Sequence, residues 1–254
     1  MNSPFGTTQA PSFMQAYLAD LAHLARALPT ATVRRTIAIA DVAAAREMAA
    51  PRPSWLAVFT KAMALAAGAH PQLKQVFSPL PWPRLYEHPF AVAAVAVNRP
   101  FDEELPTFWG RLTDPAHQGL QQLHNHLTRF KEEPVKNVGQ LRRLQARGQW
   151  PWAVRRLAWA REANLSGRRR AKRLGTFAVA SLGGAGADFV DPLYPATTVL
   201  SFGTIQAATV DVSLKFDARV LTPLMAAEIL VDVERVLNCE IVMELRYFER
   251  LEAA

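Results

Sequence analysis

Hydrophobic residues recur every third or fourth position in several stretches of the chain, the spacing that collects them on one face of a helix. This pattern predicts helices over 13–28, 55–70 and 223–238, and two shorter helical pieces between 135 and 163. Asp114 and Pro115 have the types of residue that cap and open a helix, so another helix is expected from there toward Arg129.

Other stretches have the signature of β-strands, with alternating or short continuous apolar runs rich in β-branched residues. Strands are predicted over 32–39 and 90–97, and three more in "LGTFAVASLG", "TTVLSFGTI" and "ATVDVSLKF". The segment "SPLPWPRLYEHP" is expected to be a proline-rich loop, and "EIVMELRYF" to be a final strand. Because helices and strands interleave along the whole chain, the pattern predicts an α/β sandwich formed by residues 1–254 as one domain.

Composition narrows the class of protein. The longest apolar run, Phe90–Val97, has eight residues, well short of the roughly 20 that a spanning helix needs. No lysine or arginine precedes Arg26, so the start of the chain does not have the pattern of a secretory signal. The one cysteine, Cys239, cannot form an internal disulfide, and we expect a cytoplasmic location.

The positive charge of the chain is concentrated in one segment. Residues 142–173 contain eleven basic residues and one acid, Glu162, whereas the rest of the chain has 18 basic and 21 acidic residues. The chain is therefore mildly acidic apart from one strongly basic segment, which also contains Trp150, Trp152 and Trp159.

Three segments in order carry a resemblance to a known family: "SWLAVFTKAMALAAGAHPQLKQVF", "GTFAVASLGGAG", and "TVDVSLKFDARV" followed by an amphipathic helix. They resemble the catalytic domain of dihydrolipoamide acyltransferases, the cores of 2-oxoacid dehydrogenase complexes, which share a fold with chloramphenicol acetyltransferase. The likeness covers 13–237, although 101–173 is longer than in that family and unlike it. The resemblance implies a two-layer sandwich with a mixed sheet and flanking helices, and a homotrimer whose active site lies between neighbouring subunits.

The chain contains no lipoyl domain and no peripheral-subunit-binding domain. We therefore do not expect it to be a working core of a dehydrogenase complex.

The catalytic motif of that family reads Asp-His-Arg-x-x-Asp-Gly, and its histidine is the general base. In this chain Asp217 and Arg219 match, but Ala218 stands at the histidine position and Thr222 at the second acid. A methyl group cannot take a proton from an acceptor. In the family the second acid pairs with an arginine of the first helix, and both partners of that ion pair are absent here; Thr222 before Pro223 suits a helix start instead.

A hydroxyl that stabilises the oxyanion is the family's other catalytic element. The most direct alignment places Ala180 at that position. If the alignment is shifted by one residue, Ser181 becomes the candidate. Neighbouring residues of a strand face opposite sides of the sheet, which weighs against Ser181. His88, in the proline-rich loop, is the second candidate for chemistry. The remaining cluster, His117, His124 and His126, lacks an i, i+4 ligand pair, so we expect no metal site.

The basic segment has several interpretations. In the first, its charges form a solvated face, and the tryptophans lie in the core or at a subunit contact. In the second, its charges bind the phosphates of coenzyme A. The candidates for phosphate binding are Arg168, Arg169, Arg170, Lys172 and Arg173. An acyl carrier protein, with its phosphopantetheine arm and acidic surface, and a peripheral membrane contact through 142–173 are further alternatives. No recognised nucleic-acid motif accompanies the charge, so nucleic acid is not an expected partner.

Two functions follow from this resemblance. One is a diverged acyltransferase that binds acyl-CoA or an acyl carrier protein and transfers the acyl group to an acceptor the sequence does not identify. The other is a catalytically inactive homologue that acts as a trimeric scaffold or acyl-ligand binder. Ala218 and Thr222 favour the second function, whereas Asp217 and Arg219 fit both.

Overall fold

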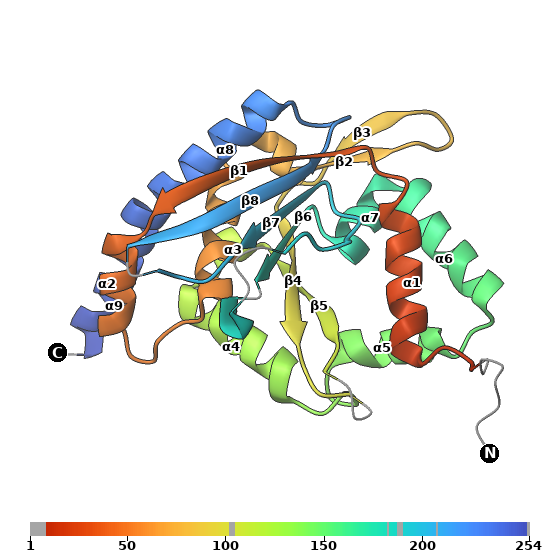
Figure 1. Cartoon of the computed structure of the whole chain (residues 1–254), viewed down its shortest axis with the longest axis horizontal. Helices are drawn as coiled ribbons and strands as arrows, with labels where there is room; N and C mark the ends of the chain where they lie inside the picture. The colour runs from red at the N-terminus through yellow and green to blue at the C-terminus, as the bar shows by residue number, and fades with distance from the viewer. Residues whose placement is uncertain (1–8, 102–104, 182, 187–189, 207, 253–254) are drawn as a thin grey trace, which may run out of the picture.

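Six strands form one mixed sheet in the computed structural model, which describes residues 9–101, 105–181, 183–186, 190–206 and 208–252. The order is β1-β8-β7-β6-β4-β5 (Figure 1). The three central strands β4, β6 and β7 are parallel, and the other pairs are antiparallel. The bounds are β1 Thr30–Ala38, β4 Val92–Asn98, β5 Thr107–Thr113, β6 Phe177–Ser181, β7 Thr198–Phe202 and β8 Thr209–Asp217. The predicted α/β class with a mixed sheet and flanking helices is confirmed.

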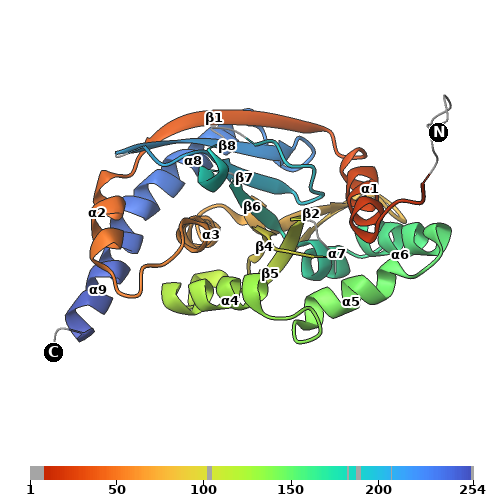
Figure 2. The same cartoon turned by 60° about the horizontal axis from the view of Figure 1, so that its bottom comes forward.

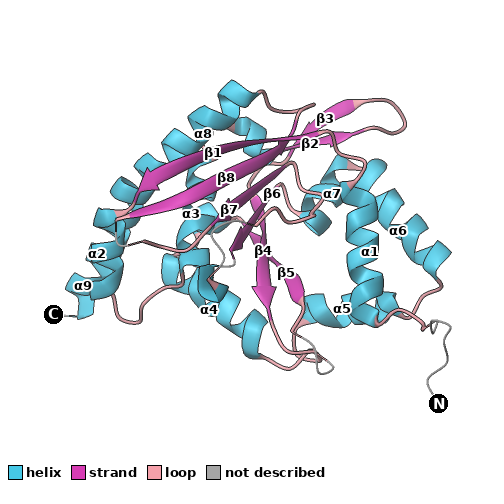
Figure 3. Cartoon of the chain, viewed as in Figure 1, coloured by secondary structure: helices cyan, strands magenta, loops and turns pink. Residues whose placement is uncertain are grey.

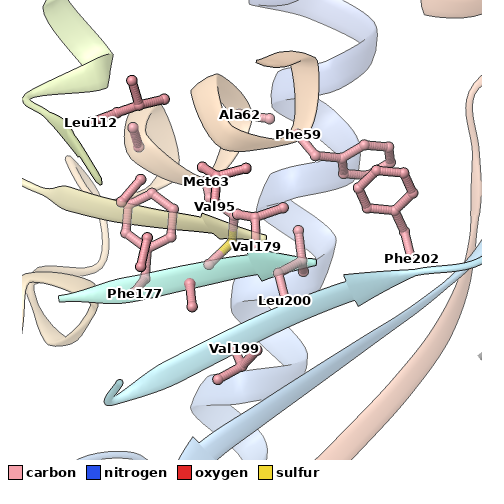
Figure 4. Close-up of a cluster of buried hydrophobic side chains, with 14 of the residues drawn as sticks. Phe59, Ala62, Met63, Val95, Leu112, Phe177, Val179, Val199, Leu200 and Phe202 are labelled. Atoms are coloured by element: carbon pink, nitrogen blue, oxygen red, sulfur yellow. The ribbon is translucent and has the colours of Figure 1, made fainter. Parts of the chain in front are cut away.

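Helix α3 (Trp55–Ala66) forms the centre of the core. Its first turn is capped by Ser54, whose hydroxyl accepts a hydrogen bond from the Ala57 N–H. Figure 4 shows Phe59 and Met63 of this helix packed on side chains from β4, β6 and β7. The ring of Phe59 stacks on Phe202, with centroids 4.1 Å apart.

Further helices flank the sheet and α3 (Figure 3). Helix α8 (Pro223–Val236) packs against both α3 and β1, while α2 (Ala40–Met48) packs against α9 (Val242–Glu252). Within the described part of the chain, no helix combines the length and the hydropathy needed to cross a membrane.

The segment between β4 and β6 returns the chain from one end of the sheet to the other, as parallel neighbours require. It contains β5 and four helices, α4 Leu120–Glu132, α5 Gly139–Gly148, α6 Trp152–Asn164 and α7 Gly167–Leu174. The basic segment is thus helical as predicted, but with a third helix, α7, beyond the two expected pieces. Figure 2 shows α5, α6 and α7 grouped beside the first helix, α1 (Phe13–Ala25).

A buried ion pair attaches these helices to α1. Asp20 of α1 is only 2% exposed, and its carboxylate accepts a hydrogen bond from the guanidinium of Arg155 on α6. A second internal pair joins Arg147 of α5 to Glu162 of α6 through bonds of 2.7 and 3.0 Å. Asp20 therefore holds the basic segment to α1, whereas Glu162 joins two helices of the segment to each other.

The outer edge of β5 is closed by a side chain. The Gln140 amide accepts a hydrogen bond from the Arg111 N–H at 2.9 Å and donates one to the Arg111 carbonyl at 3.0 Å. A side-chain amide thus takes the place of a neighbouring strand at the middle of this edge.

The predicted final strand is wrong, because residues 240–248 are helical. Helix α8 continues through a π-helical turn, Leu237–Ile241, directly into α9. Ile241 and Leu245 are buried one helical turn apart, whereas Met243 between them is exposed. The β-branched residues here belong to a helical stripe that packs on the body of the protein.

Two other expectations need correction. Asp114 and Pro115 open only a three-residue 3₁₀ helix, with Asp114 in the left-handed region, and α4 starts later, after Gly119. The proline-rich loop contains a strand, β3 (Arg84–Glu87), which pairs with β2 (Gln75–Ser78) outside the main sheet.

The buried pair between α1 and α6 predicts an asymmetric response to mutation. Arg155→Met leaves the carboxylate of Asp20 buried without its main partner, which should lower the free energy of unfolding by about 3–5 kcal/mol. Asp20→Leu combined with Arg155→Met removes both charges and should recover most of the loss. Chemical denaturation measures both effects, with Arg129→Met, in the more exposed pair with Glu133, as the control. An Arg155→Met loss no larger than that of the control would contradict the prediction.

Candidate functional site

Two adjoining hollows lie where β4, β6 and β7 end. The first, here called the apolar lobe, has a volume of about 480 Å³ and is bounded by α1, β5 and the strand ends. The second, the polar lobe, has a volume of about 520 Å³ and reaches the start of α3 and the end of α4. Ala96, Asn98 and Ser181 line both lobes, so the two hollows meet at these residues.

Ser181 is the last residue of β6, and it lines both lobes where they meet. The oxygen accepts a hydrogen bond from the Gly183 N–H at 3.2 Å. Its proton has no acceptor within the described part of the chain, so it can be donated to a ligand. Ala180 also lines the apolar lobe, because at the end of the strand both neighbours border the cavity.

The turn after Ser181 depends on glycine. A Cβ at Gly183 would lie 2.6 Å from the carbonyl oxygen of Gly203. Glycine therefore lets the end of β6 approach the end of β7, and this close approach holds Ser181 in place.

Asn98 is a site residue that the sequence analysis missed. Its side-chain oxygen accepts a hydrogen bond from the Thr107 hydroxyl at 2.6 Å, which directs the amide nitrogen away from Thr107. Both residues line the apolar lobe. The amide of Asn98 and the hydroxyl of Ser181 are thus two polar donors in a largely apolar cavity. In the sequence, Asn98 could have been noticed as the polar residue that ends the apolar run "FAVAAVAVN".

The polar lobe has a positive character. Lys131, near the end of α4, lines it together with Trp55 and Leu56 at the start of α3. The first backbone N–H groups of a helix point away from the helix and favour negative charge. This lobe can therefore accommodate an anionic group next to Ser181.

The motif loop after β8, with Ala218 at its centre, is held by several hydrogen bonds. Asp217 is buried, and its carboxylate accepts hydrogen bonds from the Arg219 guanidinium at 2.9 and 2.6 Å. The Ala218 N–H donates to the Pro29 carbonyl at 2.9 Å, while the Ala218 side chain is exposed. Thr222 caps α8 through its hydroxyl, as its sequence context predicted.

Ser181 and the motif loop lie at opposite ends of the sheet in one chain. Ser181 is beside Phe202 at the end of β7, whereas Phe216, next to Asp217, is paired with Thr198 at the start of β7. The separation along the strands is about 16 Å at roughly 3.3 Å per residue. A single chain does not bring these candidates together.

His88 lies at the end of the sheet away from Ser181, just before β4. Its side chain is buried and hydrogen-bonded to the Phe90 carbonyl at 3.0 Å. Burial lowers the pKa of His88, and the nearby charges of Lys172 and Arg168 lower it further. The neutral ring thus donates its Nδ1 proton to the carbonyl.

The five cationic candidates on α7 do not act alike. Arg168, Arg169 and Lys172 are exposed, and Arg173 is half-buried. Arg170 is buried and donates to the carbonyls of Ala163 and Pro195, and burial lowers its pKa to about 10. We therefore correct the expectation for Arg170, which joins parts of the fold and does not face a ligand.

The three histidines of the cluster named in the sequence have different surroundings. His124 accepts a hydrogen bond from the Ser54 N–H at 3.2 Å, and His117 pairs with Asp114 at 2.9 Å. His126 borders a different hollow near β5. Across the described residues, no three histidine, cysteine or acidic side chains gather as a metal site.

Solved acyltransferase structures share this fold. A probable dihydrolipoamide acetyltransferase of Listeria monocytogenes has a TM-score of 0.63 and 13% identity, with 96% of each chain covered. The dihydrolipoamide acetyltransferase of Azotobacter vinelandii, studied for catalytic roles of a serine, a histidine and an asparagine, has a TM-score of 0.66 and 16% identity over 92% of this chain and 93% of that one. Chloramphenicol acetyltransferase has a TM-score of 0.53 and 8% identity over 90% and 99%.

The fold implied by the sequence resemblance is therefore confirmed: it is the chloramphenicol acetyltransferase-like fold of dihydrolipoamide acetyltransferase catalytic domains. No family model and no curated protein matches the sequence.

The lowered pKa of His88 predicts a pH-dependent stability. As pH falls through 6.5, the unfolded chain protonates this histidine while the folded state keeps it neutral, so the free energy of unfolding should fall with pH. His88→Asn retains a donor for the Phe90 carbonyl and should flatten the slope. Denaturation curves at several mildly acidic pH values measure the slope of the free energy of unfolding against pH. The control is His117→Asn, because His117 is exposed. An unchanged slope in His88→Asn would contradict the prediction.

Proposed function

We propose that this protein binds an acyl thioester in the two lobes and transfers the acyl group to an acceptor. The observation that carries the proposal is the pair of donors, the Ser181 hydroxyl and the Asn98 amide, at the junction of an apolar and a positive hollow. The apolar lobe suits an acyl chain or the pantetheine arm. The carbonyl oxygen of the thioester would accept hydrogen bonds from these donors.

The chemistry is a simple acyl transfer. The nucleophile of the acceptor, a thiol or hydroxyl, bonds to the carbonyl carbon, and the resulting oxyanion is stabilised by Ser181 and Asn98. When the carbon–sulfur bond breaks, the departing thiolate takes a proton from water, and the acceptor loses its proton to solvent. Because Ala218 supplies no base, the rate depends on positioning of the bound partners.

The proposed active unit is a homotrimer with a site between subunits. In one chain about 16 Å separates Ser181 from the motif loop along the strands, so the loop of a neighbouring copy would complete the hollow. In this arrangement the exposed residues Arg168, Arg169, Lys172 and Arg173 are the candidates for the phosphates of coenzyme A or of a carrier protein arm.

The second candidate function is a catalytically silent trimeric scaffold or acyl-ligand binder. The hydrogen-bonded loop around Ala218 favours it, since Asp217 and Arg219 hold the loop conformation without a proton acceptor. The acyltransferase and the acyl-ligand binder both require the hollow to bind an acyl thioester, whereas a pure scaffold does not, so a binding measurement comes first.

Titration calorimetry with coenzyme A and with butyryl-CoA tests whether the site binds a thioester. We expect binding of both ligands, weakened by added salt, because phosphate contacts are screened. Ser181→Ala should reduce affinity for butyryl-CoA severalfold and leave free coenzyme A unaffected, because only the thioester has the carbonyl; losing a hydrogen bond typically costs about 1 kcal/mol. Ser201→Ala, on the neighbouring strand, is the matched control. If neither ligand binds, acyl transfer from coenzyme A thioesters loses its support, and the trimeric scaffold or a carrier-protein partner is favoured.

Restoring the base separates the two functions. If the loop lacks only its proton acceptor, Ala218→His should raise the rate of acyl transfer to a thiol acceptor by about 100-fold, the usual contribution of a general base. Ala218→Gln, of similar size but unable to act as a base near neutrality, is the control. An unchanged rate in Ala218→His, with thioester binding intact, would favour the silent binder.

A further inference from the structure

The outward face of α6 carries an exposed apolar stripe. Trp150, Val154, Leu157 and Leu165 are 44%, 51%, 72% and 44% exposed. Val154 and Leu157, three residues apart within α6, share one side of the helix, while Trp150 lies just before its start and Leu165 at its C-cap. The opposite side is anchored, because Trp159 is buried there and Arg155 is held by Asp20. The helix thus turns apolar side chains outward although it is firmly fixed to the protein.

The exposed positive charge of α6 and of the two helices next to it has little internal compensation. Arg161 lies within the stripe, and Arg142, Arg143, Arg168, Arg169 and Lys172 are exposed on the adjoining helices. No ion pair with an acidic side chain of the described residues is formed by any of these six. The one acid of the segment, Glu162, is already paired with Arg147. This side of the protein therefore has an excess of positive charge that favours an anionic partner.

We propose that this face, formed by the stripe and the surrounding arginines, is a docking surface for an anionic lipid bilayer. Trp150, 44% exposed, combines an apolar ring with a polar N–H, which suits the boundary between lipid headgroups and acyl chains. Arginine side chains lay their carbon stems along apolar surface and direct the guanidinium to phosphate. The α6 helix lies at the margin of the molecule (Figure 1), and Val154 and Leu157 on it are exposed.

The positive charge and the apolar surface of this face together favour an anionic bilayer over other partners. A polyanion such as nucleic acid would satisfy the arginines, but it offers no apolar medium for Val154 and Leu157. A second copy of the same face would repel it, since both copies carry excess positive charge. An anionic bilayer satisfies charge and apolar surface together.

Co-sedimentation of the full chain with vesicles tests the proposal. We expect binding to vesicles of phosphatidylcholine with phosphatidylglycerol, and little binding to phosphatidylcholine alone. Val154→Ser with Leu157→Ser leaves the charge unchanged and should weaken binding about tenfold or more, because less apolar surface enters the bilayer. Val231→Ser with Met243→Ser, at sites 49% and 63% exposed on other helices, is the matched control and should bind like the natural protein. Circular dichroism confirms that both variants are folded.

Three results would overturn the proposal. The first is absence of binding to the anionic vesicles. The second is equal binding by the Val154→Ser, Leu157→Ser variant, which would show that charge alone acts, as toward any polyanion. The third is a change of oligomeric state in that variant by light scattering, which would make the stripe a subunit contact. The measurement does not depend on thioester binding, so it fails or succeeds independently of the proposed function.

Discussion

The parallel pairing of β4 with β6 is the constraint from which most of the structure follows. Parallel neighbours end at the same edge of a sheet, and this places Asn98 and Ser181 side by side at the proposed site. The same pairing obliges the chain to return to the opposite edge before β6 begins. The basic segment forms part of that return, so its helices are anchored to the sheet at both ends. The basic helices and the hollow at Asn98 and Ser181 thus both depend on one crossover.

Much of the fold could be predicted from the sequence because the core elements follow simple periods. The strands β4, β6, β7 and β8 are short apolar runs, and α3 and α8 have clear helical stripes. The strand prediction was wrong for residues 240–248, because the pattern of a short apolar stretch with β-branched residues is the same in a strand and in a buried helix. The prediction of a long helix from Asp114 was also wrong, because cap residues indicate where a helix starts but not how long it is.

The site could be predicted only in part, for a topological reason. The resemblance identified Asp217, Arg219 and Ser181, and the structure shows these as an ordered loop and a strand-end hydroxyl. It could not show that they lie at opposite ends of the sheet, which depends on strand order. Asn98 was missed because a single polar residue at the end of a strand has many uses. Arg170 looked like its basic neighbours, yet its position on the inner side of α7 buries it.

The Gln140 amide on the edge of β5 has a consequence for solubility. An open strand edge is a template on which other chains can add strands and form aggregates. Because both peptide groups of Arg111 are already hydrogen-bonded to Gln140, an incoming strand would meet no free donor or acceptor at this residue of the edge. A charged or hydrophobic side chain could not satisfy both groups at once. The primary amide, which has both donor and acceptor groups, therefore makes this point of the β5 edge a poor template for a further strand.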